Sequence, residues 1–387
     1  MNNQRKALYL VFVQNTIVFT VLNVARIALS LYALHMGAGP TEVGLVVALL
    51  YMPSLFFSLP AGILADRHGS RWLFVASSAV TAAGMLVTSF LDTVPALCIG
   101  SFAVGVSLSV SNVLGQNLVG QLSTSAQRMR NFGNYALVGA LSNFVGPLMV
   151  GFVIDHAGFP PACLLAVAMS AVAALLALTW GRLLPGGQPS PPGGVNIFAS
   201  LQSPSVRRIL MLSSVAQIGF DSFNSFMPVY AHGIGLSASA IGVALSAFAV
   251  ASLAMRAVIT RLAKSWREEA IMAGGFVCGA VAFFLLPAFK LVGAISVISF
   301  VFGVFGGLTQ PIAMMMLYNA SAEGRAGEAM GLRITINNFM RVVGPTVFGA
   351  TARTFGLAPL FLGSGVLMLF AAYRSFGNRE GGASLKE

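Results

Sequence analysis

Long apolar stretches constrain this chain more than any other feature, because they recur along almost its whole length. A helix that spans a lipid bilayer needs roughly 20 mostly apolar residues. The sequence holds twelve such stretches, at 7–35, 42–63, 72–91, 94–122, 130–154, 160–183, 207–232, 238–262, 267–287, 290–320, 328–353 and 358–376. Strands of an outer-membrane barrel would alternate polar and apolar residues, and these stretches do not. We therefore predict an all-α membrane protein with twelve transmembrane helices.

Composition agrees with a membrane protein and excludes two other classes. Hydrophobic residues make up 57% of the chain and charged residues only 9%. Soluble globular proteins carry about 25% charged residues, and disordered chains are richer in charge and poorer in apolar residues. The three cysteines lack metal-ligand or CxxC spacing, so we expect no disulfide framework, no metal site and no cofactor.

Basic residues are distributed unevenly between the predicted loops. The chain carries 22 Lys and Arg against 11 Asp and Glu, a net charge of +11. With the amino end inside, seventeen basic residues, Arg333 among them, fall at inner span ends and loops, whereas Lys290 and Arg353 fall outside. This asymmetry follows the positive-inside rule, so we expect a multi-pass protein of the bacterial inner (cytoplasmic) membrane with both termini cytoplasmic. The charge excess is then an orientation signal and does not indicate a nucleic-acid partner.

One connection is long enough to separate two domains. Residues 184–206 are rich in Gly, Pro and Ser and cannot continue a helix. We predict a cytoplasmic linker there, between a six-helix bundle at 1–183 and a second at 207–376, followed by a cytoplasmic tail at 377–387.

The second half of the sequence repeats landmarks of the first half after a shift of 198 residues. No gap is needed from 32 to 158. The coinciding pairs include Gly44 with Gly242, Gly105 with Gly303, and Gly146-Pro147 with Gly344-Pro345. Six stretches separate the two copies, so the copies are parallel. Parallel six-helix halves build one large class of transporters, whose substrate site lies at the membrane midplane between the halves.

The loop after the second stretch runs GILADRHGSR from Gly62 to Arg71. It resembles the signature loop of the major facilitator superfamily, which has Gly, x, Leu, Ala, Asp, a basic residue, x, Gly and two basic residues. Serine takes the place of the first of those two. The resemblance implies the major facilitator fold and a conformational latch made by Gly62, Asp66, Arg67, Gly69 and Arg71.

A physical account of this loop stands beside the resemblance. Asp66 ends a predicted span and can pair with cations or with a helix N-terminus. The alternative is a solvated charged turn. In the second copy Lys264 stands where Asp66 would be, so a latch would be asymmetric.

The fifth stretch resembles a motif of the proton-driven exporters of that superfamily. Gly133, Gly146-Pro147 and Gly151 match the motif, whereas Ser142 and Val150 depart from it. Proline favours a kink and glycine allows close helix packing, so the resemblance implies export. Gly344-Pro345 repeats the feature in the eleventh stretch, which leaves pseudo-symmetric kinked packing as the alternative.

A second family motif is incomplete. The superfamily's fourth-span arginine is replaced by Ser101 ahead of Gly105, which leaves the usual route of proton coupling in doubt.

Asp221 is the acidic residue that falls in the middle of a predicted span. A carboxylate in hydrocarbon is costly, so it faces a cavity, pairs with a cation or takes up a proton. We predict that Asp221 is the proton-coupling site or a substrate contact. The alternative is a structural partner for an arginine.

Three arginines also fall within predicted spans: Arg26, Arg256 and Arg341. Arg256 lies near an inner end and can snorkel to the membrane surface. Arginine keeps its charge, so Arg26 and Arg341 each need an anion, a carboxylate or carbonyl groups. Either can pair with Asp221, which would leave the other to bind an anionic group of a substrate. The alternative is that both arginines are structural.

Uncharged polar residues cluster at similar depths in the predicted spans. Helices one, four, seven and ten line the cavity in the resembled family, and hydrogen bonds between helices are the alternative role. The predicted substrate-binding set comprises Arg26, Arg341, Asn23, Asn112, Gln116, Asn143, Gln217, Asn224, Gln310 and Asn337.

These features predict a secondary active transporter that works by alternating access. No GxxxxGK[ST] run for ATP is present. We expect a small amphipathic substrate, anionic if a buried arginine binds it, exported in exchange for protons. The alternatives are proton-coupled uptake of a small organic anion and a membrane sensor that does not transport. An enzyme is disfavoured because paired intramembrane acids are lacking. We expect a monomer whose partners are the substrate, protons and the bilayer.

Overall fold

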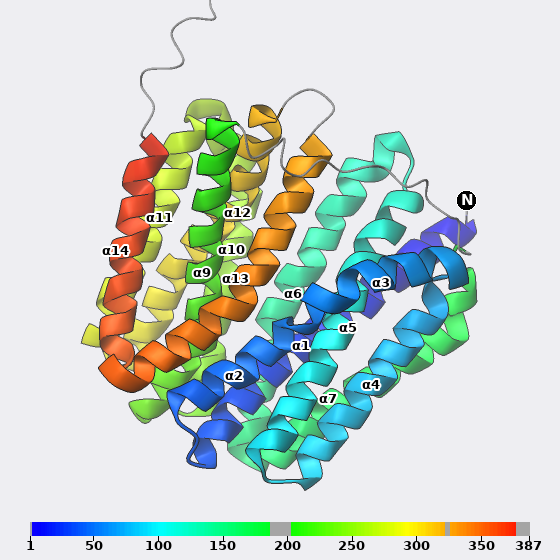
Figure 1. The fold of residues 1–387 in the computed structure, drawn as a ribbon, viewed down its shortest axis with the longest axis horizontal. Coiled ribbons are helices and arrows are strands. Elements are labelled where there is room, and N and C mark those ends of the chain that lie inside the picture. Colours follow the sequence, from blue (N-terminus) through cyan, green and yellow to red (C-terminus); the bar gives the residue numbers. More distant parts are fainter. Residues whose placement is uncertain (1, 186–202, 322–325, 377–387) are drawn as a thin grey trace, which may run out of the picture. The chain divides into compact units, whose positions relative to one another are not determined.

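The structure is a computed structural model that describes residues 2–185, 203–321 and 326–376. Within these residues the chain is helical and contains no strand (Figure 1). Most of the predicted linker at 184–206, and all of the predicted tail at 377–387, lie outside the described residues.

The helices of the first copy follow the predicted stretches closely. They are α1 (Asn2–His35), α2 (Pro40–Tyr51), α3 (Pro53–His68), α4 (Ser70–Phe90), α5 (Val94–Gln121), α6 (Ser125–Ala157), α7 (Phe159–Trp180) and a short 3-10 turn, η1 (Gly181–Leu183).

The helices of the second copy also lie where the apolar pattern predicts them. They are α9 (Pro204–Gly233), α10 (Ala238–Ser265), α11 (Glu268–Leu285), the 3-10 turn η2 (Leu286–Ala288), α12 (Val292–Ala320), α13 (Ala326–Phe355) and α14 (Leu357–Phe376).

One predicted span is interrupted. The stretch at 42–63 forms two helices, α2 and α3, which meet at Met52. Proline at position 53 lacks a backbone N–H and disfavours helical continuation through its neighbour. The helix therefore breaks there, although the apolar run continues across the break.

The repeat is visible in the backbone of the turns. Gly37 and Gly235 have φ of 81° and 88°, and Gly158 and Gly356 have φ of 87° and 83°. Each pair is 198 residues apart, and this left-handed conformation favours glycine. The two copies therefore end these helices in the same way.

Ten of the described helices are long and apolar enough to cross a membrane. The helices α9 and α13 have 30 residues each but are not among these ten. They carry Asp221, Arg333 and Arg341, so charged candidate groups lie on these two helices.

The described residues form two compact units. Unit 1 draws on Met1–Gly193, Asn224–Ser246 and Arg341–Thr354, and unit 2 on Gly194–Phe223, Ala247–Met340 and Phe355–Glu387. Three helices of the second copy, α9, α10 and α13, therefore contribute residues to both units. The division at the linker into 1–183 and 207–376 stays a prediction.

Each unit has its own apolar interior. In unit 1, α1 packs against α5, α6 and α7, and a buried cluster includes Val11, Phe74 and Leu114. In unit 2, α11 packs against α12 and α14, and Phe223 stacks on Phe302 with ring centroids 4.1 Å apart. Close packing of this kind holds membrane helices together, because lipid gives no hydrophobic drive for their association.

Candidate functional site

Two networks of largely buried polar side chains contain most of the predicted proton- and substrate-binding residues. The arginine network lies in unit 1 and consists of Arg26, Asn23, Asn143 and Asn224. The aspartate network lies in unit 2 and consists of Asp221, Gln217, Gln310, Arg333 and Ser213.

The arginine network is centred on α1. Arg26 is only 5% exposed, and its Nη2 donates to Oδ1 of Asn23 at 2.7 Å and to Oδ1 of Asn224 at 3.3 Å. Asn23 in turn donates from Nδ2 to Oδ1 of Asn143, on α6, at 3.0 Å. The network thus brings together four residues that the sequence analysis predicted as a group.

The hydrogen-bond partners of the Arg26 guanidinium are neutral groups. Among the residues that the structure describes, no carboxylate lies within ion-pair distance of Arg26, and its buried Nε has no hydrogen-bond partner. Arginine remains protonated even when buried. The network therefore presents a full positive charge whose partners are two amide oxygens, and this arrangement suits an anionic ligand.

Asn224 is the residue that the 198-residue shift places on Arg26. The two side chains are hydrogen-bonded, so equivalent positions of the two copies meet in unit 1. The same shift places Asn23 on Asp221, so each copy has one charged residue and one asparagine in exchanged order.

The aspartate network begins on α9. Asp221 is 3% exposed, and Nε2 of Gln217 donates to its Oδ2 at 2.7 Å. Nε2 of Gln310, on α12, donates to Oε1 of Gln217 at 3.3 Å. Phenylalanines surround this part of α9: Phe220 meets Phe248 edge to face at 5.5 Å.

Arg333 completes the aspartate network, and the sequence analysis missed this role. It counted Arg333 with the basic residues of inner span ends, yet the side chain is only 6% exposed. Nη2 donates to Oε1 of Gln310 at 2.8 Å, and Nε donates to Oγ of Ser213 at 2.8 Å. Since α13 begins at Ala326, Arg333 lies about two turns inside the helix. The predicted start of this span at 328 already placed Arg333 inside the span.

The other predicted polar residues are placed less centrally. Arg341 lies with its guanidinium carbon 5.6 Å from the ring centroid of Tyr51, in unit 1. Asn337 is buried, and its Oδ1 has no hydrogen-bond partner among the described residues. On α5, Asn112 is half-buried and Gln116 is exposed.

The predicted latch is partly described. Gly69 joins α3 to α4 with φ of 79°, and Gly62 packs near Val113. Arg67 is exposed, and the side chain of Asp66 lies outside what the structure describes. Arg71 donates from Nη2 to the backbone oxygen of Leu178, on α7, at 2.6 Å.

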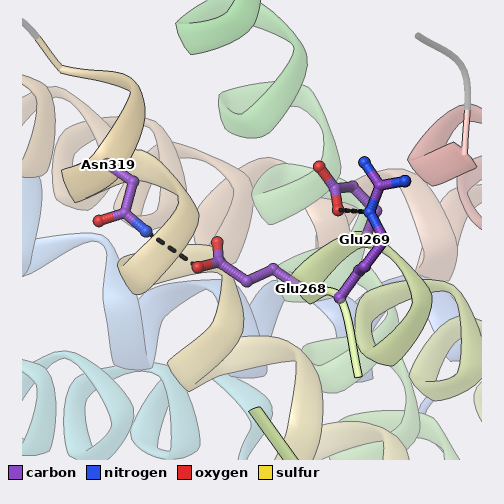
Figure 2. A network of polar contacts seen from close by, with 4 residues as sticks. Glu268, Glu269 and Asn319 are labelled. Carbon is purple, nitrogen blue, oxygen red and sulfur yellow. Dashed lines mark hydrogen bonds and ion pairs between the residues drawn. The ribbon is translucent and has the colours of Figure 1, made fainter. Parts of the chain in front are cut away.

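The corresponding turn of the second copy carries two acids, Glu268 and Glu269, where the first copy has Ser70 and Arg71. Glu268 accepts a hydrogen bond from Nδ2 of Asn319 at 2.9 Å (Figure 2). Glu269 lies beside Arg267, with an N–O distance of 3.8 Å. Both acids lie in the first turn of α11, where they complement the helix dipole. Glu269 is the repeat equivalent of Arg71, so the charge at this position is reversed between the copies.

The proline-containing helices make two equivalent crossings within unit 1. A Cβ on Gly44 would lie 2.6 Å from the backbone oxygen of Pro345, and a Cβ on Gly242 would collide with the backbone oxygen of Pro147. A Cβ on Gly146 would lie 2.7 Å from Cβ of Asn23, whereas one on Gly344 would meet nothing within 4 Å. Backbone contacts this close explain why glycine recurs in both copies.

A carboxylate reinforces one of these crossings. Asp155 accepts hydrogen bonds from the backbone N–H groups of Ala238 and Ser239, at 2.9 and 2.8 Å, at the start of α10. The repeat equivalent of Asp155 is Arg353, which is exposed. The two crossings therefore have glycines at equivalent positions, but only the crossing with α10 has a carboxylate bonded to the N-terminus of the helix.

Comparison with known proteins identifies relatives along nearly the full chain. Quinolone resistance protein NorA of Staphylococcus aureus is 22% identical over 385 residues, which cover 93% of this chain and 94% of the relative. The class B tetracycline resistance protein of Escherichia coli is 20% identical, with 79% of this chain and 77% of the relative covered. Multidrug resistance protein MdtG of Enterobacter lignolyticus is 22% identical, with 88% and 83% covered.

Solved structures of other transporters share the fold. The nucleoside transporter NupG has a TM-score of 0.78 at 16% identity, covering 98% of this chain and 100% of that chain. A POT family transporter in complex with 5-aminolevulinic acid has a TM-score of 0.79 at 14% identity, with 95% of each chain covered. The predicted all-α major facilitator fold is thereby confirmed.

The family model described as Major Facilitator Superfamily matches residues 11–345, and a further match covers 209–385. The matched region includes both polar networks and the glycine crossings. The names of the relatives describe drug resistance, and those of the fold neighbours describe transporters. This chain belongs to the major facilitator superfamily and is a multi-pass membrane transporter of small molecules.

Proposed function

We propose that this transporter exports small amphipathic compounds that carry an anionic group, in exchange for protons. The observation that carries the proposal is the buried guanidinium of Arg26, whose partners are two asparagine oxygens. The proposal assigns substrate recognition to the arginine network and proton binding to Asp221.

The chemistry of Arg26 supports an anionic substrate. Removing a charge from water is costly, and two neutral hydrogen bonds offset only part of that cost. Both bonds use Nη2, so the Nε edge of the guanidinium can still donate. A carboxylate is the group that this planar fork binds best. Asn23 and Asn224 hold the fork in place for it.

The position of Asp221 supports a role in proton coupling. Asp221 is 3% exposed, and a carboxylate in the apolar interior must face a cavity, pair with a cation or take up a proton. Asp221 and Asn224 lie one turn apart on α9, and Asn224 bonds to Arg26. A movement of α9 can therefore affect the acid and the arginine network together, as coupled transport requires.

The relatives favour export over uptake. Their names describe resistance to quinolones, to tetracycline and to multiple drugs. Expelling a compound confers resistance, whereas taking it up does not.

The proposal places the transporter in the bacterial inner membrane as a monomer with both termini cytoplasmic, and the exposed tryptophans support this orientation. Trp72, Trp180 and Trp266 are all exposed. Each lies at a helix end that the orientation places on the cytoplasmic side, where indole rings act as interfacial anchors.

Proteoliposomes provide the test. Norfloxacin, a quinolone that carries a carboxylate, is the probe for an anionic group, and ethidium, a permanent cation without a carboxylate, is the control. Exchange with protons predicts that norfloxacin accumulates in vesicles with an acidic lumen, because protons leave as the substrate enters. Accumulation driven only by an acidic exterior would indicate uptake by symport, and binding without counterflow would indicate a sensor. Transport of ethidium but not norfloxacin would contradict the role of Arg26.

A further inference from the structure

We propose that Arg333 fixes the direction of the hydrogen-bonded chain that ends at Asp221, so that the chain fits ionised Asp221 and loosens when Asp221 binds a proton. The inference rests on the proposed role of Asp221 as the proton site. It makes Arg333 a positioning residue that links the proton to helix movement in unit 2.

The direction of the chain follows from its chemistry. Arginine can only donate hydrogen bonds, so Gln310 must present Oε1 to Arg333, at 2.8 Å. Nε2 of Gln310 then faces Oε1 of Gln217. Nε2 of Gln217 therefore faces Oδ2 of Asp221, at 2.7 Å. Every donor in the chain points toward the carboxylate.

A proton on Oδ2 of Asp221 cannot be absorbed by turning the amides. Turning Gln217 would place its Nε2 against Nε2 of Gln310. Turning Gln310 as well would place its Nε2 against the guanidinium of Arg333, which has no acceptor. Each turn of an amide moves the donor–donor mismatch to the next pair of side chains, so one hydrogen bond of the series is lost in every arrangement. If the proton is on Oδ1, Oδ2 becomes a neutral acceptor, and its hydrogen bond weakens.

The chain ties three helices together. Ser213, Gln217 and Asp221 lie four residues apart on one face of α9. Arg333 of α13 holds this face at Ser213 directly, and at Asp221 through Gln217 and Gln310 of α12. The bond between Gln217 and Asp221 lies within α9, whereas the bond between Gln217 and Gln310 joins α9 to α12. When Gln217 turns to accept the proton of Asp221, the bond that is lost is the one between α9 and α12, while the Ser213 contact keeps α9 beside α13.

The first copy lacks this series of hydrogen bonds, although its helices meet in an equivalent way. Tyr135 donates to Oδ1 of Asn15 at 3.1 Å, and these positions correspond to Arg333 and Ser213. The equivalents of Gln217 and Gln310 are Phe19 and Asn112, which cannot continue a chain of this length. The chain occurs in the copy that contains the acid, as expected if it serves that acid.

Other charged groups on the helices packed in unit 2 also contribute to the local field. The described ones are Arg207 and Arg208 on α9, Arg256 and Arg261 on α10, Glu268 and Glu269 on α11, and Arg374 on α14. On α13, Arg333 belongs to unit 2, whereas Arg341 belongs to unit 1. Arg333 is the cation to which the hydrogen bonds from Asp221 lead through Gln217 and Gln310.

Infrared spectroscopy of the protein in proteoliposomes tests the inference. The signal is the carboxylic-acid C=O band that the Asp221→Asn variant lacks, followed as a function of pH. Because Arg333 favours the ionised carboxylate, Arg333→Gln should raise the pH of half-protonation by about one unit. Tyr135→Phe, the equivalent site of the first copy, should leave it unchanged.

A second variant covers the case in which Arg333→Gln does not fold. Gln310→Leu breaks the chain without removing the charge, and it should also raise the pH of half-protonation. An unchanged value in the folded variants would overturn the role of the chain. A pH-dependent band that Asp221→Asn fails to remove would instead overturn Asp221 as the proton site, which is a failure of the proposed function.

Discussion

The helix pair α1–α6 and its repeat equivalent, α9–α13, use the same register for different chemistry. Residues 120 apart bond in both pairs: Asn15 with Tyr135 in unit 1, and Ser213 with Arg333 in unit 2. The first pair carries the charged Arg26 beside the neutral Asn23. The second carries Asp221 where Asn23 would be and Asn224 where Arg26 would be. The scaffold is repeated, whereas the charges are divided between the copies.

This difference suggests how one repeated scaffold serves two ligands. A cation in one copy can recognise an anionic compound, and an acid in the other can bind a proton. An arginine at position 224 would lie against Arg26, because Asn224 is hydrogen-bonded to it, and the two like charges would repel each other.

The largest effect is expected for Asp221→Asn. Asparagine keeps the shape of the side chain and can accept a hydrogen bond from Gln217, but it cannot bind a proton. We expect accumulation of norfloxacin in vesicles with an acidic lumen to be lost, while counterflow at equal pH continues. The control is Glu269→Gln on α11, which should accumulate norfloxacin at the wild-type level. Accumulation by Asp221→Asn would place the proton elsewhere.

Removing the charge of the first copy should weaken binding of the anionic substrate. Hydrogen bonds to charged groups contribute about 1.5–3 kcal/mol, so Arg26→Gln should raise the Kd for norfloxacin by roughly 10- to 100-fold. Titration calorimetry of the purified protein measures this. Arg26→Lys keeps the charge but loses the planar fork, and should give an intermediate Kd. An unchanged Kd for Arg26→Gln would mean that the arginine is structural.

Replacing a glycine at a helix crossing by alanine should destabilise the protein equally in the two copies. Gly242→Ala and Gly44→Ala each place a Cβ against backbone atoms of a proline-containing helix. We expect a loss of about 1–3 kcal/mol of stability for each, seen as a lower Tm in detergent. Gly274→Ala is the matched control, because a Cβ there meets nothing within 4 Å. A large loss at only one crossing would show that the copies differ in packing as well as in charge.

The smallest effect concerns the cap of α10. Asp155→Ala removes two hydrogen bonds to backbone N–H groups and should cost about 1 kcal/mol. Arg353→Ala, at the equivalent position of the other crossing, should change stability by less than about 0.5 kcal/mol. Thermal unfolding of both variants measures the difference, and equal losses would remove this asymmetry.

Much of the fold was predictable because apolar stretches define membrane helices regardless of context. The break between α2 and α3 was not foreseen, since the apolar run continues through it and the proline at 53 acts only on the backbone. Gly44 and Gly242 could be matched by register alone. Which helix each glycine meets depends on packing and became visible only in the structure.

The candidate site was predictable where charge stands out against apolar sequence. Asp221 and Arg26 were found in this way. Arg333 was missed because it lies close to a predicted span end, where a basic residue is expected to face water. The amide partners of each charge could not be assigned, since amides at similar depth are interchangeable in sequence and are distinguished only by hydrogen-bond geometry.

The most direct test of the division of charge is proton movement driven by the substrate itself. Vesicles containing a trapped pH dye are given a norfloxacin gradient, and proton flux is recorded beside counterflow. We predict that Asp221→Asn keeps norfloxacin counterflow and moves no protons. In Arg26→Gln, counterflow and proton flux should fall by the same factor. Substrate-driven proton flux through Asp221→Asn at the wild-type rate would contradict the account.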